Sequence, residues 1–341
     1  MRYAVDHITA TSAVLEDTAR ALRAAGMSAA RTLPIAGRVF GAAPQLELDG
    51  RVVFVTGAAR GIGAEVARQA HARGARVALV GRRLEPLQQL AAELGDGAAA
   101  FQADVSDLDA LQSAADATVA RFGGIDVVIA NAGIAPPSEP ILTIDPGEFE
   151  RTVDIDLLGQ WRTIRATLPA VIERRGHILV VASIYSFVNG ALNASYAASK
   201  AGVEQLTRAL RVELAHHGAT AGVAYLGFVD TDLVGDVFAQ QQIVEARSIA
   251  PSFVTRPIPV TRAGRTLVDG IESRAATVAA PGWIRPLLPL RGLAGTLMDE
   301  FMLANPGLSR AISQAERNRT SNEPDSAPGP DQLSAPPSNI L

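Results

Sequence analysis

The stretch that most constrains the fold is residues 51–72, an apolar run that leads through three glycines into a helical pattern. The opening of the run is rich in β-branched and aromatic residues, as a strand buried on both faces requires. A glycine turn between a strand and a helix presents backbone N–H groups at the positive end of the helix dipole. This arrangement predicts a site for a phosphate, such as the pyrophosphate of a dinucleotide.

The three glycines are Gly57, Gly61 and Gly63, so their spacing is Gly-x-x-x-Gly-x-Gly rather than the commoner Gly-x-Gly-x-x-Gly. A glycine-rich turn alone can be a plain structural turn, and that alternative stays open for an isolated match. The strand before the turn and the helix after it favour the phosphate site.

Composition narrows the class of protein. The chain has 341 residues, of which 48% are hydrophobic and 19% charged, which is enough apolar material for a large buried core. The net charge of −4 gives no basic surface for nucleic acid, so none is expected as a partner. The absence of cysteine excludes disulfides, thiolate zinc sites and a cysteine nucleophile. We expect no secretory signal and no membrane-spanning helix, and therefore a cytoplasmic protein.

From residue 51 onward, apolar runs alternate with helical patterns. Strands are predicted at 51–56, 76–80, 98–101, 125–130, 177–182, 220–226 and 276–279. Helices are predicted at 84–94, 108–122, 146–174, 196–216 and 262–274, with a break in the third near Pro169. Buried strands that alternate with helices indicate a parallel sheet covered on both sides. The sequence thus predicts an α/β fold, a Rossmann-like doubly wound parallel sheet of about seven strands with helices on both faces.

Four regions are expected along the chain. Residues 1–48 form a helical N-terminal extension, and residues 49–281 form the nucleotide-binding domain. Residues 282–315 are apolar and are interpreted as a lid or a subunit contact, with peripheral membrane contact as the alternative. Residues 316–341 are rich in Pro, Ser, Asn and Asp and are expected to be a disordered tail.

A second motif, Tyr196-Ala-Ala-Ser-Lys200, opens a predicted helix. Residues four apart share a helix face, so the two side chains can reach one site. A tyrosine is a poor base at neutral pH, but a nearby ammonium favours its phenolate. The pair is a way to move a proton without histidine or metal. Ser183 ends the preceding strand, where its hydroxyl could hold a substrate oxygen.

Taken together, these motifs resemble those of the short-chain dehydrogenase/reductase family. The resemblance rests on Thr56-Gly-Ala-Ala-Arg-Gly-Ile-Gly63, Asn131-Ala-Gly133, Ser183 and Tyr196-x-x-x-Lys200, and covers roughly residues 48–281. It implies hydride transfer between a nicotinamide cofactor and an alcohol or carbonyl carbon. Tyr196 would be the acid/base, Ser183 would orient the substrate oxygen, and Lys200 would bind the nicotinamide ribose and lower the pKa of Tyr196.

The resemblance also implies a set of cofactor-binding residues. Asp104 and Val105 would contact the adenine, and Thr231 the nicotinamide carboxamide. The full set is Thr56, Gly57, Arg60, Gly61, Ile62, Gly63, Arg82, Arg83, Asp104, Val105, Asn131, Ala132, Gly133, Tyr196, Lys200, Val229 and Thr231. We expect a homodimer or homotetramer.

Two departures from the family pattern stand out. Asp156 occupies the place of an asparagine that helps to hold a water in the family's proton relay, and we count Asp156 with the catalytic residues. We expect its carboxylate near Ser183, Tyr196 and Lys200, with some water between. Leu226-Gly227 replaces a usual Pro-Gly. Neither departure removes the Ser/Tyr/Lys group.

The choice of cofactor follows from charge. Enzymes that use NAD place an acid at the end of the second strand to bind the ribose hydroxyls. Here Gly81 is followed by Arg82 and Arg83, with Arg60 in the glycine turn, and these cations would welcome a 2′-phosphate. NADP is therefore predicted in preference to NAD. The alternative is that Arg82 and Arg83 only cap a surface loop.

The remaining alternatives concern the substrate and the class of function. Apolar residues expected near the site, among them Tyr185, Phe187 and Phe228, suggest an apolar alcohol or ketone, although core packing explains them equally well. The chain has no nucleophile elbow and no His/Asp/Glu cluster with metal spacing, so neither a serine hydrolase nor a metal site is predicted. A low-turnover nucleotide-binding protein with a redox-sensing or interaction role is the second hypothesis.

Overall fold

The computed structural model describes residues 45–238 and 252–320. Its centre is a sheet of seven strands in the order β3-β2-β1-β4-β5-β6-β7, and every neighbouring pair is parallel. The strands are β1 (Val52–Thr56), β2 (Arg76–Gly81), β3 (Ala98–Gln102), β4 (Val127–Ala130), β5 (His177–Ser183), β6 (Thr220–Leu226) and β7 (Thr277–Ala280). The order reverses between β1 and β4, as in doubly wound folds, which confirms the predicted fold class.

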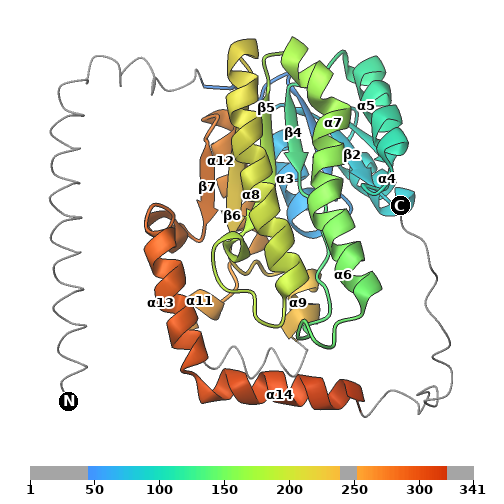
Figure 1. Ribbon diagram of the computed structural model, residues 1–341. Helices are drawn as coiled ribbons and strands as arrows, with labels where there is room; N and C mark the ends of the chain where they lie inside the picture. Colours follow the sequence, from blue (N-terminus) through green and yellow to red (C-terminus); the bar gives the residue numbers. More distant parts are fainter. Residues whose placement is uncertain (1–44, 239–251, 321–341) are drawn as a thin grey trace, which may run out of the picture. The chain divides into compact units, whose positions relative to one another are not determined.

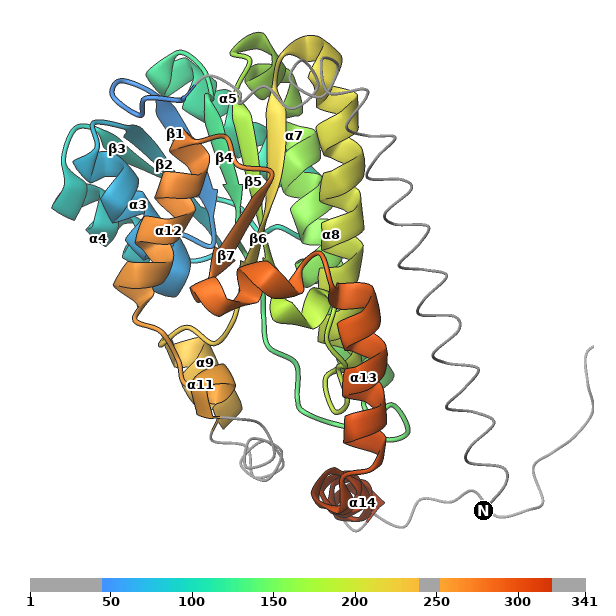
Figure 2. The same ribbon diagram turned by 90° about the vertical axis from the view of Figure 1, so that its left-hand side faces the viewer.

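Helices cover both faces of the sheet (Figures 1 and 2). One face packs against α3 (Gly61–Ala72), α4 (Leu84–Leu94) and α12 (Val260–Glu272). The other face packs against α5 (Leu108–Phe122), α7 (Gly159–Glu173) and α8 (Ala194–Leu214). Alternate residues of each strand therefore enter two separate cores, and β1, β4 and β5 are buried along their whole length.

The long helix expected over 146–174 is divided in a way the sequence did not predict. It consists of α6 (Pro146–Val153), a π-helical turn (Asp154–Leu158) and α7. We had expected Pro169 to mark a break, and that was wrong, because Pro169 lies inside α7. The turns on either side of Pro169 are held by the buried side chains of Thr167 and Val171, so packing keeps the helix continuous. The actual irregularity is the π turn, and it carries Asp156.

The nucleotide-binding domain begins earlier than the expected boundary at residue 49. Leu46 and Leu48 are buried, and the Leu46 N–H donates to the Glu272 carbonyl at 2.7 Å, so residues 45–48 pack with the domain rather than with an extension. The predicted helix within residues 1–44 lies outside the described residues.

Beyond β7 the chain forms a short 3₁₀ turn (Gly282–Leu287), then α13 (Arg291–Leu303) and α14 (Pro306–Thr320). The first five residues of the expected disordered tail, 316–320, are therefore helical, and the remainder falls outside the described residues. Leu308, Ala311 and Ala315 are buried, and this packing supports a helix that the polar composition alone did not suggest.

Two short helices, α9 (Asp232–Phe238) and α11 (Ser252–Thr255), follow β6. Both views place them with α13 at the same end of the sheet (Figures 1 and 2). Among the helices that the structure describes, none is both long and apolar enough to cross a membrane.

Candidate active site

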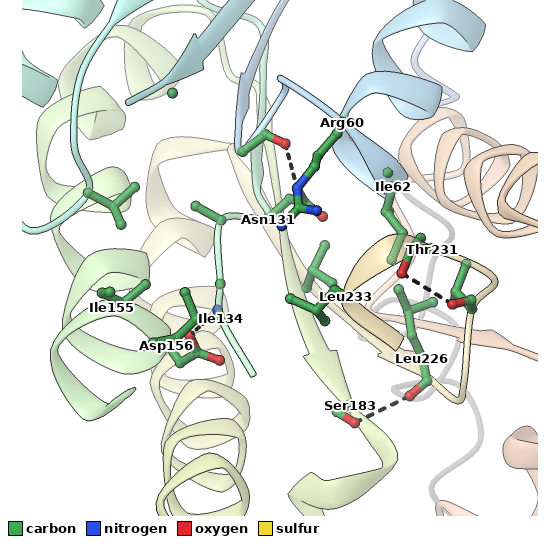
Figure 3. A pocket seen from close by; sticks show the side chains of 18 of the residues that line it. Arg60, Ile62, Asn131, Ile134, Ile155, Asp156, Ser183, Leu226, Thr231 and Leu233 are labelled. Atoms are coloured by element: carbon green, nitrogen blue, oxygen red, sulfur yellow. Dashed lines mark hydrogen bonds between the residues drawn. The ribbon is translucent and has the colours of Figure 1, made fainter. Parts of the chain in front are cut away.

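A cleft of ≈620 Å³ opens at the carboxyl ends of the strands, where parallel sheets of this kind bind ligands. It brings together almost all of the residues singled out from the sequence (Figure 3). Those that line it are Gly57, Arg60, Gly61, Ile62, Arg82, Arg83, Asp104, Val105, Asn131, Ala132, Gly133, Asp156, Ser183, Tyr196, Lys200, Val229 and Thr231. Thr56 and Gly63 do not line the cleft, but they contact residues that do, namely Asn131 and Gly57.

The glycine turn after β1 is compact for steric reasons. Gly57 has φ +67°, and a Cβ there would lie 2.9 Å from the Ala132 Cα. A Cβ on Gly63 would collide with the Gly57 carbonyl oxygen. No side chain caps α3 at Arg60, so the N–H groups of its first turn remain available to an anion in the cleft.

Thr56 and Asn131 join the ends of β1 and β4 beneath this turn. The Thr56 Oγ1 accepts hydrogen bonds from the backbone N–H groups of Asn131 (3.1 Å) and Ala132 (3.3 Å). The Asn131 Nδ2 donates to the Thr56 carbonyl at 3.0 Å. These contacts explain why Thr56 and the Asn-Ala-Gly segment belong to one site although 75 residues separate Thr56 from Asn131.

Arginines gather at one end of the cleft. Arg82 and Arg83 follow β2 directly, and the Arg82 Nε lies 3.9 Å from the Asp104 Oδ2. The Arg60 Nη1 lies 3.2 Å from the Asp232 Oδ2, and both side chains are largely exposed. The sequence analysis did not single out Asp232, although it directly follows Thr231 at the start of α9.

The opposite end holds the hydroxyl groups and the lysine. Ser183 ends β5, and its hydroxyl donates to the Leu226 carbonyl at 3.4 Å (Figure 3). Tyr196 lies in the first turn of α8 and is hydrogen-bonded to Ser183. Lys200 follows one turn later, with its Nζ 5.3 Å from the centre of the Tyr196 ring. The shared helix face predicted from the spacing therefore brings the two side chains together.

Asp156 is fully buried and makes a direct ion pair with Lys200. Its Oδ2 lies 3.4 Å from the Lys200 Nζ, and its Oδ1 accepts a hydrogen bond from the Ile134 N–H at 2.7 Å. We had expected water between Asp156 and the group around Lys200. The direct contact arises because the π turn carries Asp156 on an element packed against α8.

Burial and charge compete in this group. Burial raises the pKa of Tyr196 and the Asp156 carboxylate raises it further, while Lys200 and the hydrogen bond with Ser183 lower it, and the net direction is upward. Burial lowers the pKa of Lys200, but Asp156 and Tyr196 outweigh burial, so Lys200 stays charged. Burial raises the pKa of Asp156 against the opposing effects of Lys200 and the Ile134 N–H. Lys200 thus lowers the pKa of Tyr196, as predicted, but by less than burial raises it.

The cleft wall also includes apolar residues that were not among the predicted site residues, namely Ile134, Leu226, Leu233 and Val234. Ile134 could have been found because it directly follows the Asn-Ala-Gly motif. In contrast, Tyr185, Phe187 and Phe228 do not line this cleft: Tyr185 and Phe187 pack against the core, and Phe228 contacts Phe238. Within the described ranges, no group of three or more His, Asp or Glu side chains could hold a metal ion.

Comparison with known proteins agrees with this geometry. Residues 51–242 match the family model described as "short chain dehydrogenase". A cis-4-hydroxycyclohexanecarboxylate dehydrogenase from Sinomonas cyclohexanicum is 35% identical over 216 residues, which are 62% of this chain and 87% of the relative.

Two solved structures extend the comparison to three dimensions. An alcohol dehydrogenase from the archaeon Thermococcus sibiricus, complexed with 5-hydroxy-NADP, has a TM-score of 0.58 and 25% identity, and the match covers 67% of this chain and 95% of that one. A 3-ketoacyl-(acyl-carrier-protein) reductase from Brucella melitensis, complexed with NADH, has a TM-score of 0.60 and 27% identity, over 68% and 96% of the two chains. Similar structures therefore include complexes with a cofactor that carries the 2′-phosphate and with one that lacks it.

Proposed function

Because the chain belongs to the short-chain dehydrogenase/reductase family, and is thus an oxidoreductase with a nicotinamide-binding fold, we propose that it interconverts an apolar secondary alcohol and its ketone with NADP. The observation that carries the proposal is the meeting of Ser183, Tyr196 and Lys200 at the buried end of one cleft. Tyr196 and Lys200 are neighbours on one helix, but Ser183 lies on a separate strand, so the meeting of all three residues depends on the fold.

The cleft fits a dinucleotide on physical grounds. The N–H groups at the start of α3 have no side-chain cap, and glycine at 57 and 63 lets the turn pack closely against Asn131 and Ala132. This cradle suits a pyrophosphate. A nicotinamide bound further along the cleft would exchange a hydride with the substrate carbon.

The chain's own residues would manage the proton and the orientation. In the direction of reduction, Tyr196 donates its hydroxyl proton to the substrate oxygen while Ser183 donates a hydrogen bond to the same oxygen. The Lys200 ammonium stabilises the phenolate that Tyr196 becomes. In the direction of oxidation, Tyr196 starts as the phenolate and takes the proton of the alcohol.

The preference for NADP is supported by charge. No acid ends β2, and Arg60, Arg82 and Arg83 all line the adjoining part of the cleft. A 2′-phosphate there would form charge-assisted hydrogen bonds with the guanidinium groups. The preference for an apolar substrate is supported by Ile134, Leu226 and Val234 in the wall of the same cleft.

We also infer a homodimer or homotetramer. Leu158 and Trp161, in and just after the π turn, are each 41% exposed, and a second subunit would cover them. Light scattering coupled to size exclusion would give the mass in solution, and a monomer at micromolar concentration would contradict this inference.

The function is tested with the purified full chain and a panel of linear and cyclic ketones and their alcohols, using NADPH, NADH and their oxidised forms. We expect turnover of apolar ketones with NADPH, and a kcat/KM at least about tenfold lower with NADH. The Tyr196→Phe variant serves as the inactive control. Cofactor binding without turnover of any pair would contradict the proposal and favour the alternative, a nucleotide-binding protein with a redox-sensing or interaction role.

A further inference from the structure

The two hydroxyl groups of the proposed active site lie at opposite ends of one loop. Ser183 ends β5, and Tyr196 lies in the first turn of α8. The segment between them includes the 3₁₀ turn Ile184–Ser186 and residues 187–193. The loop does not itself line the cleft described above, but it joins the two residues that would hold the substrate oxygen. α13, which lies outside the residues matched by the family model, contacts this loop and the helix that follows it.

The first contact is an ion pair at the start of α13 between a half-buried arginine and a buried glutamate. The Arg291 Nη1 lies 2.5 Å from the Glu204 Oε1, and the Glu204 side chain is only 6% exposed. Glu204 lies one turn after Lys200 on α8. Arg208 is a second cation for Glu204, but it is more distant at 3.7 Å and more exposed. Arg291 is therefore the principal partner of a carboxylate that the fold has taken out of water.

The ion pair is joined to the loop through Tyr225 of β6. The Tyr225 side chain interacts electrostatically with both Glu204 and Arg291, and burial followed by Glu204 raises its pKa to about 12, so it stays protonated. The Tyr225 ring packs edge-on against the Phe187 ring, with centroids 5.8 Å apart. Phe187 is the first residue of the loop 187–193. A change in the position of Arg291 can therefore move the loop through the packed side chains of Tyr225 and Phe187.

The second contact lies further along α13. The Asn189 Nδ2 donates a hydrogen bond to the Asp299 Oδ1 at 2.9 Å, while the Asn189 Oδ1 accepts one from the Ala191 N–H at 2.9 Å. Between the two contacts, Gly295 faces the Phe187 carbonyl, and a Cβ on Gly295 would lie 3.8 Å from that oxygen. α13 thus meets the loop at its start and at its middle, and from one side.

We propose that α13 is a substrate-specificity element, in which Arg291 and Asp299 are positioning residues that hold the loop 187–193 and so determine which apolar alcohols or ketones fit. This inference rests on the proposed function and names the part of the chain that selects the substrate. It assigns no step in the chemistry to α13, because Lys200 and Tyr196 are oriented separately by Asp156 and Ser183.

The proposal predicts a particular pattern of kinetic change. Loosening the loop changes the room available to the distant part of a large substrate, whereas a small ketone is held near Ser183 and Tyr196 in either case. The KM for a two-ring ketone such as decalone should therefore change, with little change in its kcat and little change for butanone.

The experiment compares four variants of the full chain. Arg291→Gln removes the cation opposite Glu204, Arg291→Lys keeps it, Asp299→Ala removes the acceptor for Asn189, and Asp299→Asn keeps an acceptor oxygen. Arg285→Gln, at an exposed arginine in the preceding 3₁₀ turn, is the matched control. Steady-state kinetics with decalone and butanone, the Kd of NADPH, the Tm and hydrogen exchange of residues 187–193 are measured for each.

We expect Arg291→Gln to change the decalone-to-butanone ratio of kcat/KM by about tenfold through KM, and Asp299→Ala by about threefold. Both should speed hydrogen exchange in the loop, while Arg291→Lys, Asp299→Asn and Arg285→Gln stay near the native values. If Arg291→Gln does not fold, Asp299→Ala decides, because Asp299 is exposed and buries no charge.

Two results would overturn the proposal. One is an equal loss of kcat/KM for both ketones, which would make α13 a stability element alone, and the other is unchanged ratios in all variants. Failure of the proposed function is recognised separately, because the native chain would then reduce neither ketone. In that case, unchanged hydrogen exchange of the loop in Arg291→Gln and Asp299→Ala would also refute the inference that α13 holds residues 187–193. Faster exchange would show that α13 holds the loop but would refute its role in substrate specificity.

Discussion

The two ends of the cleft contain ion pairs of nearly the same length in opposite surroundings. The Asp156–Lys200 pair spans 3.4 Å with side chains 0% and 4% exposed, and the Arg60–Asp232 pair spans 3.2 Å with side chains 77% exposed at Asp232 and 53% at Arg60. Distance alone would rank them as equals. Burial separates them, because charges in a poorly polarisable interior interact far more strongly than charges screened by water and salt.

This difference suits what each end would do. At the buried end, a single charge alters the protonation of its neighbours, and the pKa values of Asp156, Tyr196 and Lys200 all move upward. At the exposed end, arginines can exchange a carboxylate for a cofactor phosphate at little cost, since exposed pairs contribute only ~0–1 kcal/mol. Substitutions at the buried end should therefore change chemistry, and those at the exposed end should change cofactor affinity.

The largest effect should come from Tyr196→Phe. The ring and its packing remain and only the ionisable hydroxyl is lost, so we expect kcat to fall by a factor of about 10³, in line with the usual contribution of a general acid–base. The Kd of NADPH, measured by fluorescence titration, should stay within about twofold. Tyr185→Phe, at a neighbouring ring that packs edge-on against Tyr196, is the control. Residual activity within tenfold of native would remove Tyr196 from the mechanism.

Asp156→Asn should alter the pH profile rather than abolish activity. The carboxylate raises the pKa of Tyr196, so its removal should lower that pKa. In oxidation, where the phenolate is the base, the rising limb of the rate should move to lower pH. In reduction, where the protonated hydroxyl is needed, the falling limb should also move to lower pH. Measuring kcat for oxidation and for reduction across pH 5–11 tests both shifts.

The control for this prediction is Asp154→Asn. Asp154 lies two residues earlier in the π turn and pairs with Arg162 at 2.7 Å outside the cleft. Its profile should match that of the native enzyme. Limbs that stay in place in Asp156→Asn would show that the charge of Asp156 has no influence on the proton relay.

Arg82→Asp should affect the cofactor and not the chemistry. The new carboxylate would repel a 2′-phosphate and offer an acceptor to the ribose hydroxyls, so the ratio of the NADP and NAD dissociation constants should shift toward NAD by about tenfold or more. Arg68→Ala controls for the loss of an exposed cation, because Arg68 pairs with Glu93 and does not line the cleft. An unchanged ratio would refute the charge argument for NADP.

The smallest effect should be that of Asp232→Asn. Releasing Arg60 from an exposed partner frees it for a phosphate, so NADPH should bind up to about threefold more tightly, and the gain should disappear at high salt. Isothermal titration at two ionic strengths measures it, with Asp269→Asn in the exposed pair with Arg73 as the control. A change of more than tenfold in the Kd of NADPH would mean that the Arg60–Asp232 pair also restrains α9, in addition to keeping Arg60 from the phosphate.

The sequence predicted the elements whose pattern is local. β6 (Thr220–Leu226), α4 (Leu84–Leu94) and α5 (Leu108–Phe122) have the predicted bounds, because each combines a clear apolar period with turn or cap residues at its ends. The pairing of Tyr196 with Lys200 was predictable for the same reason, since four residues of helix separate them in any fold. The family motifs then located Ser183 and the glycine turn.

Tertiary structure decided what depends on contacts between distant segments. The π turn that carries Asp156 to Lys200 follows from packing of the turn against α8, and no local pattern marks it. The helix α14 extends through a polar stretch because the rest of the fold buries its few apolar residues. Arg291 and Glu204 are ordinary charged residues in the sequence, and they form an ion pair with a buried carboxylate only when α13 meets α8. Periodicity reports which face of an element is apolar, whereas the energy of a charge depends on the solvent excluded by chain segments far away.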